Sequence, residues 1–578
     1  MSDTVSYPNA WYALVDYLRA IGVDTVFGLP ADDLVVLRAI EATPIRMVLC
    51  RDQRNAAFMA TGHALRSGGP AVCVIGKGPA TTNVATGLLE ANRSGAPLVV
   101  LAAGTASQVR GSGAFQELDQ IAVLSPLVKW AHRVDHPSRV IPALERAFFL
   151  STNGAPGPVY VELPDHLLTE EVVRTRDWRL PHPVRSGPDP AVLAESLLAL
   201  RGASRRVLLV GGGMRRRNGD HAIERLAELL GAAVFATASG RGVVDETNEM
   251  FCGLAGLYSP QEAEPLWEQA DLVVSLGSRL EETATFGKGF ANPATPVLQV
   301  NVEPGDVSTD WGGPVVLADG AAVVQSWVSA LAGEPDQPNR EWVERVHACH
   351  TDSARRIEHE REQMAAKPEI HIAELLAALD TVLPERRILV QENGLQDMWS
   401  YFYPFWRCGS EADSIVPSEQ TSLGFGASAA AGVRLAAPDT PVVAFIGDGA
   451  FGMLGNDLGV LVEEGIGVLY VVLRNGGYGW LQAQLNKAGG SGSRFSFVSA
   501  DGTADTCHAT QPGVHHVVLM DKDRLHQDLE LALEATVKGQ VAVVEVPVRL
   551  SDIPAALAEL DGDFPVRPDE NSKEVVTP

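Results

Sequence analysis

Residues 441–480 read PVVAFIGDGAFGMLGNDLGVLVEEGIGVLYVVLRNGGYGW and predict a strand–helix–strand unit. Val442–Ile446 is a continuous apolar run of the length expected for a buried parallel strand. It leads into Gly447–Gly449, and apolar residues at helical spacing follow over Phe451–Val462. A second apolar run, Val468–Leu473, predicts the next strand. Because ligands of open α/β sheets bind at the carboxyl ends of the strands, we expect a ligand site where these two strands end.

Oxygen-bearing side chains follow both strands, Asp448 after the first and Asn475 after the second. With the backbone carbonyl of Gly477 they form a partial shell of hard oxygen ligands, which suits Mg²⁺ or Ca²⁺ when phosphate oxygens complete it. Gly447 and Gly449 let a diphosphate approach the backbone closely, beside a helix N-terminus that favours anions. Gly-Asp-Gly alone also makes an ordinary turn. The second polar strand end favours a metal and diphosphate site.

This pattern resembles the diphosphate-anchoring motif of thiamine-diphosphate enzymes, in which GDG is followed about 25 residues later by NN. In this chain the first Asn of that pair is Arg474 and the second is Asn475. The resemblance implies that thiamine diphosphate is the cofactor and that Asp448, Asn475 and the carbonyl of Gly477 hold Mg²⁺. The departure at Arg474 leaves this set of ligands intact.

Length and composition describe a multidomain globular protein. A chain of 578 residues is too long for one core, and 46% hydrophobic with 6% aromatic residues is an ordinary composition. The net charge of −26 and the pI of about 4.9 argue against nucleic acid and against anionic membrane surfaces as partners. The alternative is that the negative charge has no specific function, as in many acidic proteins without a special partner.

Cysteine spacing and hydropathy indicate a cytoplasmic protein. The six cysteines show no CxxC spacing, which is typical of free thiols in a reducing compartment. We expect no signal peptide, because the N-terminus lacks a basic region followed by an apolar core, and no membrane-spanning run. The cysteines are Cys50, Cys73, Cys252, Cys349, Cys408 and Cys507.

Alternating strand and helix patterns predict three α/β domains with parallel sheets. Their expected ranges are 1–180, 190–335 and 369–550, followed by an acidic C-terminal tail at 551–578. Proline-rich polar stretches at 181–190 and 333–340 are the linkers. Besides the two strands above, the expected strands are Thr25–Phe27, Met47–Cys50, Ala71–Ile75, Pro97–Ala102, Pro158–Leu163, Val207–Val210, Ala233–Ala236, Leu272–Leu276, Val297–Val300 and Ile388–Val390.

The order of the three domains resembles the acetolactate synthase and benzaldehyde lyase branch of the thiamine-diphosphate family. The resemblance implies three doubly wound parallel-sheet domains: pyrimidine-binding, central and diphosphate-binding. In this family the pyrimidine ring binds between the first domain of one subunit and the third domain of another. It therefore implies a homodimer or homotetramer with active sites between subunits. Beyond the anchoring motif, the resemblance rests on Val26–Pro30, Gly76–Asn83, Gly113–Glu117 and Ser422–Gly426.

The resemblance also assigns roles to individual residues. Leu423 would wedge under the cofactor and hold it bent, although a leucine at such a turn is also an ordinary core residue. Phe115 and Gln116 would face the thiazolium ring, where an amide can donate a hydrogen bond to a developing oxyanion. Without the family, the same stretch is an ordinary start of a helix.

Two further segments match positions around the cofactor. Pro30 ends a turn beside the active site, and Asn393 and Gly394 lie where the family binds the diphosphate and aminopyrimidine. A polar strand end without a ligand is the alternative for the second segment.

Asp52 is the largest departure from the family pattern. The family usually has Glu at this position, where it bonds N1′ of the pyrimidine and promotes the imino form, and this chain reads Arg51-Asp52-Gln53. Asp withdraws the carboxylate by one C–C bond, about 1.5 Å. The alternative is that Asp52 only caps the helix that begins near Asn55, a role for which Asp is well suited. We favour a functional Asp because the family pattern continues through Gln53.

A glycine-rich strand end in the central domain suggests a nucleotide. Gly211–Gly213 precede Met214 and Arg215–Arg217, and we expect a helix to begin there. Such a segment could bind FAD, or ADP as part of a coenzyme A site, by resemblance to different members of the family. A solvated basic turn is the alternative.

We therefore expect an enzyme that uses thiamine diphosphate and Mg²⁺ to cleave or form a C–C bond next to a carbonyl. The small-molecule substrate would be a 2-oxo acid or a 2-hydroxy ketone. The alternatives are a simple 2-oxo acid decarboxylase, an acyl-CoA lyase, and a subunit that binds the cofactor without turnover.

Overall fold

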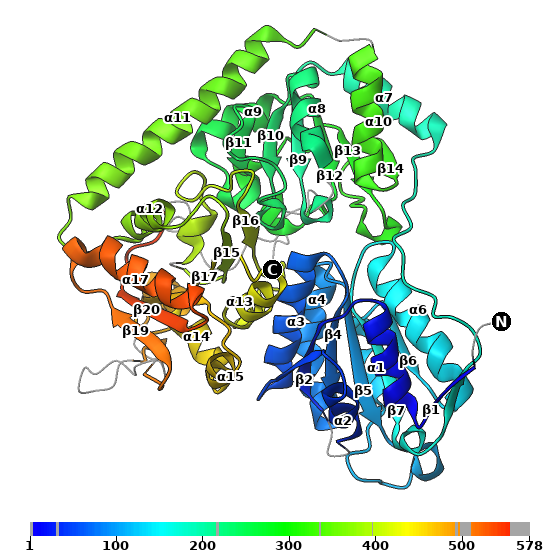
Figure 1. Ribbon diagram of the computed structural model, residues 1–578. Coiled ribbons are helices and arrows are strands. Elements are labelled where there is room, and N and C mark those ends of the chain that lie inside the picture. The colour runs from blue at the N-terminus through cyan, green and yellow to red at the C-terminus, as the bar shows by residue number, and fades with distance from the viewer. Residues whose placement is uncertain are drawn as a thin grey trace, which may run out of the picture.

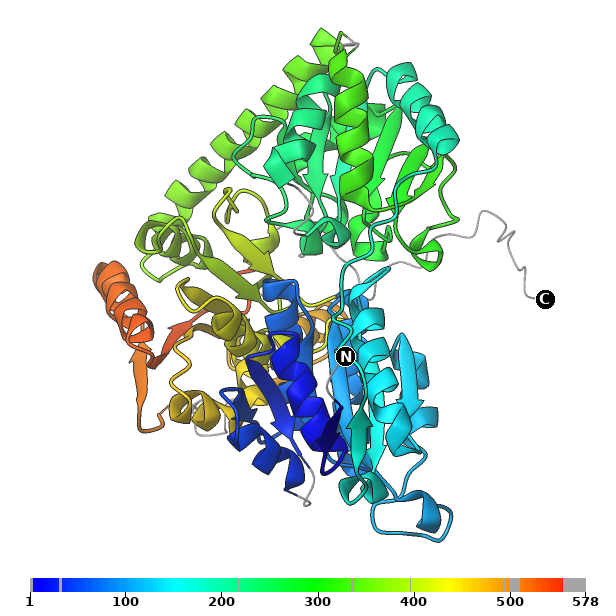
Figure 2. The same cartoon turned by 45° about the vertical axis from the view of Figure 1, so that its right-hand side comes forward.

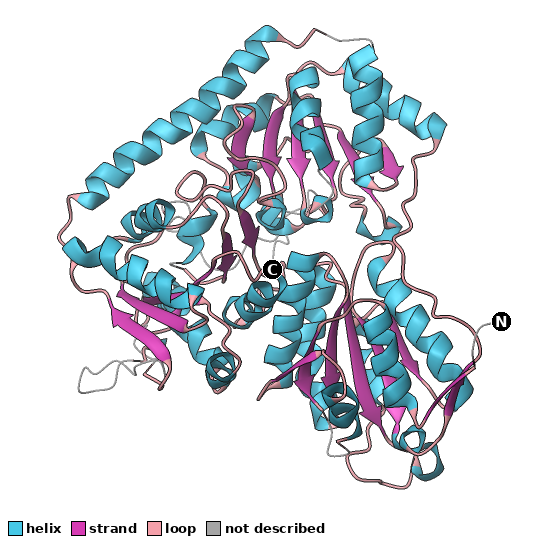
Figure 3. Ribbon diagram, viewed as in Figure 1, coloured by secondary structure: helices cyan, strands magenta, loops and turns pink. Residues whose placement is uncertain are grey.

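Three parallel sheets, each covered by helices, build the protein (Figures 1 and 3). This computed structural model describes residues 4–30, 34–215, 219–333, 337–395, 397–491, 495–497 and 510–554. Of the sequence features above, Arg216, Arg217, Cys507 and most of the predicted tail lie outside the described residues. Within them, no helix combines the length and the apolarity needed to cross a membrane.

The first sheet has six parallel strands in the order β3-β2-β4-β5-β7-β6. Alternate residues of its strands face two cores: Val26 packs with α1 (Ala10–Ala20) and α6 (Val140–Thr152), and Phe27 with α3 (Gln53–Ser67) and α4 (Pro79–Arg93). The strands are β2 (Thr25–Leu29), β3 (Arg46–Leu49), β4 (Ala71–Ile75), β5 (Leu98–Gly104), β6 (Trp130–Arg133) and β7 (Val159–Pro164).

The second sheet is also parallel, in the order β11-β10-β9-β12-β13-β14. The prediction of a helix directly after the glycine-rich end of β9 is wrong. A 3-10 turn covers Gly212–Met214, and the next α-helix, α8, starts at Ala222. The strands are β9 (Arg206–Val210), β10 (Ala233–Ala236), β11 (Phe251–Leu254), β12 (Leu272–Leu276), β13 (Val297–Asn301) and β14 (Val315–Leu317).

The third sheet has the order β16-β15-β17-β18-β20-β19, again with parallel pairs throughout. The prediction of three doubly wound parallel-sheet domains is therefore confirmed. The strands are β15 (Ile388–Gln391), β16 (Asp413–Ile415), β17 (Val442–Gly447), β18 (Leu469–Arg474), β19 (Val514–Val518) and β20 (Val541–Pro547).

The helix expected between β17 and β18 is in fact two helices. α14 (Asp448–Leu454) and α15 (Asp457–Glu463) are separated at Gly455, whose backbone has φ +55° and ψ −130°. Glycine reaches this conformation without the steric cost that a side chain would add. The apolar periodicity of the segment continues across Gly455. It therefore predicts the buried face of both helices but not the point at which the chain divides into two.

Helices α3 and α13 (Phe425–Ala436) join the first and third domains at the centre of the molecule (Figures 1 and 2). A Cβ added to Gly62 would lie 2.3 Å from the carbonyl oxygen of Ala429, and one added to Gly432 would lie 1.7 Å from that of Met59. The two helices therefore cross with their backbones in contact. α11 (Arg340–Ala365) runs from the central to the third domain.

Candidate active site

A cavity of about 1020 Å³ opens at the carboxyl ends of β17 and β18 and extends into the central domain. Gly447, Asp448, Gly449, Asn475 and Gly477 all line it. The parallel pairing explains this, because Gly447 of β17 lies opposite Leu473 of β18 and the polar residues that follow each strand emerge at one edge. The structure thus brings together the residues on which the sequence analysis is based.

Asp448 is the first residue of α14, and its carboxylate is held by backbone amides. Oδ1 accepts a hydrogen bond from the amide of Gly449 (2.9 Å), and Oδ2 from that of Gly476 (2.8 Å). Burial raises the pKa of Asp448 to about 6, against the lowering effect of these amides and of Arg474. A buried carboxylate of this kind gains from a cation beside it.

The donors around Asp448 fit a hard divalent cation that also binds a ligand. The amide oxygen of Asn475 accepts from the amide of Gly477 (2.9 Å), which orients the side chain at the cavity edge. A Cβ added to Gly447 would meet no atom within 4 Å, so this backbone faces open space. No cluster of three or more His, Cys, Asp or Glu side chains within the described ranges could hold a metal, so a cation at this site would need amide and carbonyl oxygens as well.

Arg474 is paired with a buried carboxylate of a neighbouring strand. Its guanidinium bonds Glu545 at 2.9 Å, and the other oxygen of Glu545 contacts Nε2 of His516 at 2.8 Å. The Glu545 side chain is 1% exposed, so removing Arg474 would leave a buried carboxylate with less compensation. Arg474, the residue that departs from the family motif, therefore links β18 to β20, and Glu545 in turn links β20 to β19.

Leu423, Asn393 and Gly394 also line the cavity. Leu423 precedes α13 and is 48% exposed, which is unusual for a large apolar side chain and leaves it available to a ligand or to another subunit. The core alternative for this residue is therefore wrong.

Two buried carboxylates lie beside these residues: Glu392, which belongs to the segment that matches the cofactor-binding position of the family, and Asp397, which the sequence did not single out. Glu392 and Asp397 are each 1% exposed and both line the cavity. Burial raises the pKa of Asp397 to about 7 and raises the pKa of Glu392 well above its usual range. Oε2 of Glu392 accepts from the amide of Gly426 (3.0 Å). A sequence signal existed, since an acidic residue directly precedes the apolar aromatic stretch that begins at Met398.

The remaining candidates lie at the carboxyl edge of the first sheet. Pro30 follows β2, Asp52 follows β3, and Phe115 and Gln116 belong to the connection after β5. None of these four described residues lines the cavity of its own chain. Phe115 is 72% exposed, although apolar side chains of this size are usually covered. One chain thus carries two separate groups of candidate residues, one on the first domain and one on the third.

Asp52 is the N-cap of α3. Its Oδ1 accepts hydrogen bonds from the amides of Arg54 (2.8 Å) and Asn55 (3.3 Å), and the amide group of Asn83 lies 3.5 Å away. Among the described residues, none donates a hydrogen bond to Oδ2. The capping alternative is therefore confirmed as a structural role, and it leaves one carboxylate oxygen for another partner.

Close backbone packing explains the glycines of the central domain. A Cβ added to Gly211 would lie 2.3 Å from the carbonyl oxygen of Gly277, and one added to Gly213 would lie 2.8 Å from the same atom. The ends of β9 and β12 are pressed together here, so a side chain could not be accommodated. Both strand ends line the central part of the cavity.

The described arginines near this cavity connect domains. Arg215 bonds Asp413 at 2.5 Å and the carbonyl oxygen of Ser414 at 2.7 Å, both in the third domain. Arg279 bonds Asp306 at 2.9 Å and the carbonyl oxygen of Arg93 at 2.6 Å. A solvated basic turn is therefore the wrong description of Arg215.

Comparison with known protein families assigns all three domains. The family described as "Thiamine pyrophosphate enzyme, N-terminal TPP binding domain" matches residues 9–123. The corresponding "central domain" matches residues 193–324, and the "C-terminal TPP binding domain" matches residues 393–546.

Several curated proteins are similar over most of their length. An acetolactate synthase large subunit of Lactococcus lactis subsp. lactis is 26% identical, covering 93% of this chain and 93% of the relative. That of Parasynechococcus marenigrum is 27% identical, covering 92% of this chain and 86% of the relative. A probable acetolactate synthase large subunit of Methanococcus aeolicus is 25% identical, covering 81% and 80%.

Proposed function

The chain belongs to the thiamine pyrophosphate enzyme family, and on this premise we propose that it catalyses the carboligation of 2-oxo acids. The proposal draws on the relatives named acetolactate synthases and on one structural observation. That observation is the pair of polar strand ends, Asp448 and Asn475, at one edge of a cavity large enough for a cofactor and a substrate. When bound, thiamine diphosphate supplies the nucleophilic carbon that attacks the carbonyl of a 2-oxo acid.

On this proposal the third domain anchors the diphosphate. Asp448, Asn475 and the carbonyl of Gly477 would hold Mg²⁺, whose ligand preference matches these oxygens. The backbones at Gly447, Gly449 and Gly394, with the side chain of Asn393, would receive the diphosphate. The buried carboxylate of Asp448 supports this assignment, because a divalent cation would offset the cost of its burial.

Residues of a second copy would complete the site, in a homodimer or homotetramer. Leu423 would support the cofactor from below, while Phe115 and Gln116 of the other copy face the substrate and Pro30 adjoins them. Asp52 of that copy would exchange a proton at the pyrimidine ring through Oδ2. The proposal is supported by the exposure of Phe115, which does not line the cavity of its own chain.

We assign residues 1–180 to the pyrimidine-binding domain, 190–335 to the central domain and 369–550 to the diphosphate-binding domain. FAD or ADP would occupy the central part of the cavity, between the ends of β9 and β12. Because packing accounts for the glycines there, the extension of the cavity is what supports this ligand. A yellow preparation that releases FAD on denaturation would identify a flavin, and released ADP would identify the other ligand.

Product analysis tests the proposed reaction. Purified protein is incubated with thiamine diphosphate, Mg²⁺ and a panel of 2-oxo acids, singly and in pairs, and the products are identified by NMR. Carboligation predicts 2-hydroxy-3-oxo acids together with one CO₂ for each product. Aldehydes alone would indicate a decarboxylase. No product despite tight cofactor binding would indicate a subunit without turnover.

A further inference from the structure

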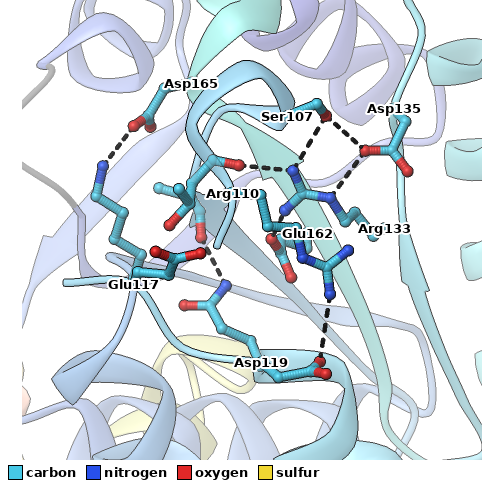
Figure 4. A network of polar contacts seen from close by, with 12 residues as sticks. Ser107, Arg110, Glu117, Asp119, Arg133, Asp135, Glu162 and Asp165 are labelled. Atoms are coloured by element: carbon cyan, nitrogen blue, oxygen red, sulfur yellow. Dashed lines mark hydrogen bonds and ion pairs between the residues drawn. The ribbon is translucent and has the colours of Figure 1, made fainter. Parts of the chain in front are cut away.

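The connection between β5 and α5 (Gln120–Leu124) presents Phe115 and Gln116, and its first part is clamped by Arg133 (Figure 4). We call residues 105–119 the Gln116 loop. The guanidinium of Arg133 donates to the carbonyl oxygen of Thr105 (2.6 Å) and to Oγ of Ser107 (3.2 Å). It is ion-paired with Asp135 (2.8 Å) and with Glu162, whose side chain is 4% exposed. The start of the loop is therefore fixed to β6 and β7.

The end of the loop is fixed by a buried amide side chain. Oε1 of Gln120 accepts from the amide of Gly78 (2.7 Å) and from Oγ1 of Thr81 (2.8 Å), while its Nε2 donates to the carbonyl oxygen of Ala103 (2.9 Å). A Cβ added to Gly78 would lie 2.6 Å from the carbonyl oxygen of Gln116. The backbone of Gln116 therefore rests directly on the turn after β4.

Between these anchors, the loop adopts a conformation that local preference does not favour. Gln116 has φ +56°, a region that residues with a side chain rarely occupy, and Gly111 and Gly113 also have positive φ. The amides of Gly111, Gly113 and Ala114 converge on one point. Converging amide dipoles repel one another unless an anion receives them.

The carboxylate of Glu117 is that anion. One oxygen accepts from the amide of Gly111, and the other from the amides of Gly113 (3.0 Å) and Ala114 (3.0 Å). These bonds, that of Gly111 most of all, hold the pKa of Glu117 below its usual range. Charge-assisted bonds of this kind are stronger than those to a neutral acceptor.

We propose that Glu117 is a positioning residue, whose carboxylate sets the conformation in which the Gln116 loop presents Phe115 and Gln116 to the reacting carbon. Its role in catalysis rests on the proposed function, whereas its role in ordering the loop does not. Both oxygens of its carboxylate are occupied by amides of the loop, so Glu117 acts through the residues that it positions. Its removal therefore lowers turnover and leaves cofactor affinity unchanged.

Hydrogen exchange measured by mass spectrometry tests the ordering role without cofactor. In Glu117→Gln, the peptide that covers residues 110–117 is expected to exchange about 10-fold faster or more, because its amides lose their charged acceptor. Peptides from β5 and α4 should be unchanged, which shows that the fold is intact. Asp119→Asn is the matched control, because Asp119 is exposed on the same loop and lies 3.7 Å from Arg110. Unchanged exchange at residues 110–117 in Glu117→Gln would overturn the proposal.

Kinetics of the same variants test the catalytic consequence. Glu117→Gln should lower kcat about 10- to 100-fold, because misplaced catalytic groups lose orientation. The Kd for thiamine diphosphate should stay within about twofold. Glu117→Asp should lie between wild type and Glu117→Gln in both kcat and exchange, and Asp119→Asn should match wild type. Faster exchange with normal kcat would overturn the catalytic part. Wild-type protein that binds no cofactor would overturn the proposed function and leave the exchange result to decide the role of Glu117.

Discussion

Asp52 caps a helix, and the proposed function gives its short side chain a second role at the cofactor. Its Oδ1 caps α3 through the amides of Arg54 and Asn55, which fixes the direction of the carboxylate. A Glu at this position would reach about 1.5 Å further. Asp in place of the Glu that is usual in the family therefore stabilises the start of α3. Proton exchange would have to occur at Oδ2, the oxygen that the cap does not use.

Asp52→Asn separates these two roles, because Asn caps helices as well as Asp does. The midpoint of thermal unfolding should stay near that of wild type, while turnover falls about 10²- to 10⁴-fold if the carboxylate exchanges a proton. Asp52→Ala is the comparison: it loses the cap as well, at a cost of about 1 kcal/mol. Full activity in Asp52→Asn would show that the reaction does not use this carboxylate.

Asp397 makes stability depend on pH. Its folded pKa of about 7 lies above the value of about 3.9 for an unfolded chain, so the native state holds the proton more tightly. The contribution of the protonated Asp397 to the free energy of unfolding is complete below the pKa of the unfolded chain. It is lost as pH rises through the pKa of the folded protein. Asp397→Asn should therefore raise the unfolding midpoint relative to wild type more at about pH 8 than at about pH 5.5. A difference that does not change with pH would contradict this.

At the scale of elements, the crossing of α3 and α13 depends on glycine. Gly432→Ala would place a methyl group 1.7 Å from the carbonyl oxygen of Met59, so the helices would have to separate. We expect a loss of about 1–3 kcal/mol or more in the free energy of unfolding, measured in denaturant. Gly202→Ala, at the end of α7 (Pro190–Gly202), is the control because its Cβ would meet no atom within 4 Å. Equal stability of the two variants would contradict the crossing.

The same elements show how far sequence reasoning extends. Strands such as β17 and β18 are predicted well, because a buried parallel strand is a continuous apolar run. The edge strands β14 and β16 were not predicted, because each has only three residues. β20 was not predicted either, although Val541–Val544 is a continuous apolar run of the same kind. The turn of the chain at Gly455 and the contact of Gly211 with Gly277 depend on which backbones meet in space, and residue type alone does not show this.

In the candidate site, too, some features could be predicted from the sequence and others depend on contacts in space. Asp448 and Asn475 could be predicted because they directly follow recognisable strands. The raised pKa of Asp397 could not, because it reflects burial by residues distant in sequence. The carboxylate of Glu117 gains its role only when the loop folds back on itself.

At the scale of the whole molecule, the two groups of candidate residues should act together only between copies. Asp52→Asn inactivates the first-domain group, and Asp448→Ala the third-domain group. Mixed after dissociation and reassociation, the two inactive variants should recover up to about a quarter of wild-type activity, because half of the dimers are mixed and each has one intact site. No recovery, with mixed dimers shown by native mass spectrometry, would place the whole site within one chain.

Calorimetric titration of thiamine diphosphate in the presence of Mg²⁺ tests the central claim, that the strand ends at Asp448 and Asn475 anchor the cofactor. Wild type should bind about one cofactor per chain at micromolar Kd or tighter. Asp448→Ala should weaken binding about 100-fold or more, because a charged metal ligand is lost, while its circular dichroism spectrum is retained. Asp439→Ala, at an exposed carboxylate of the same domain, should bind as wild type does. Unchanged affinity in Asp448→Ala would contradict the account.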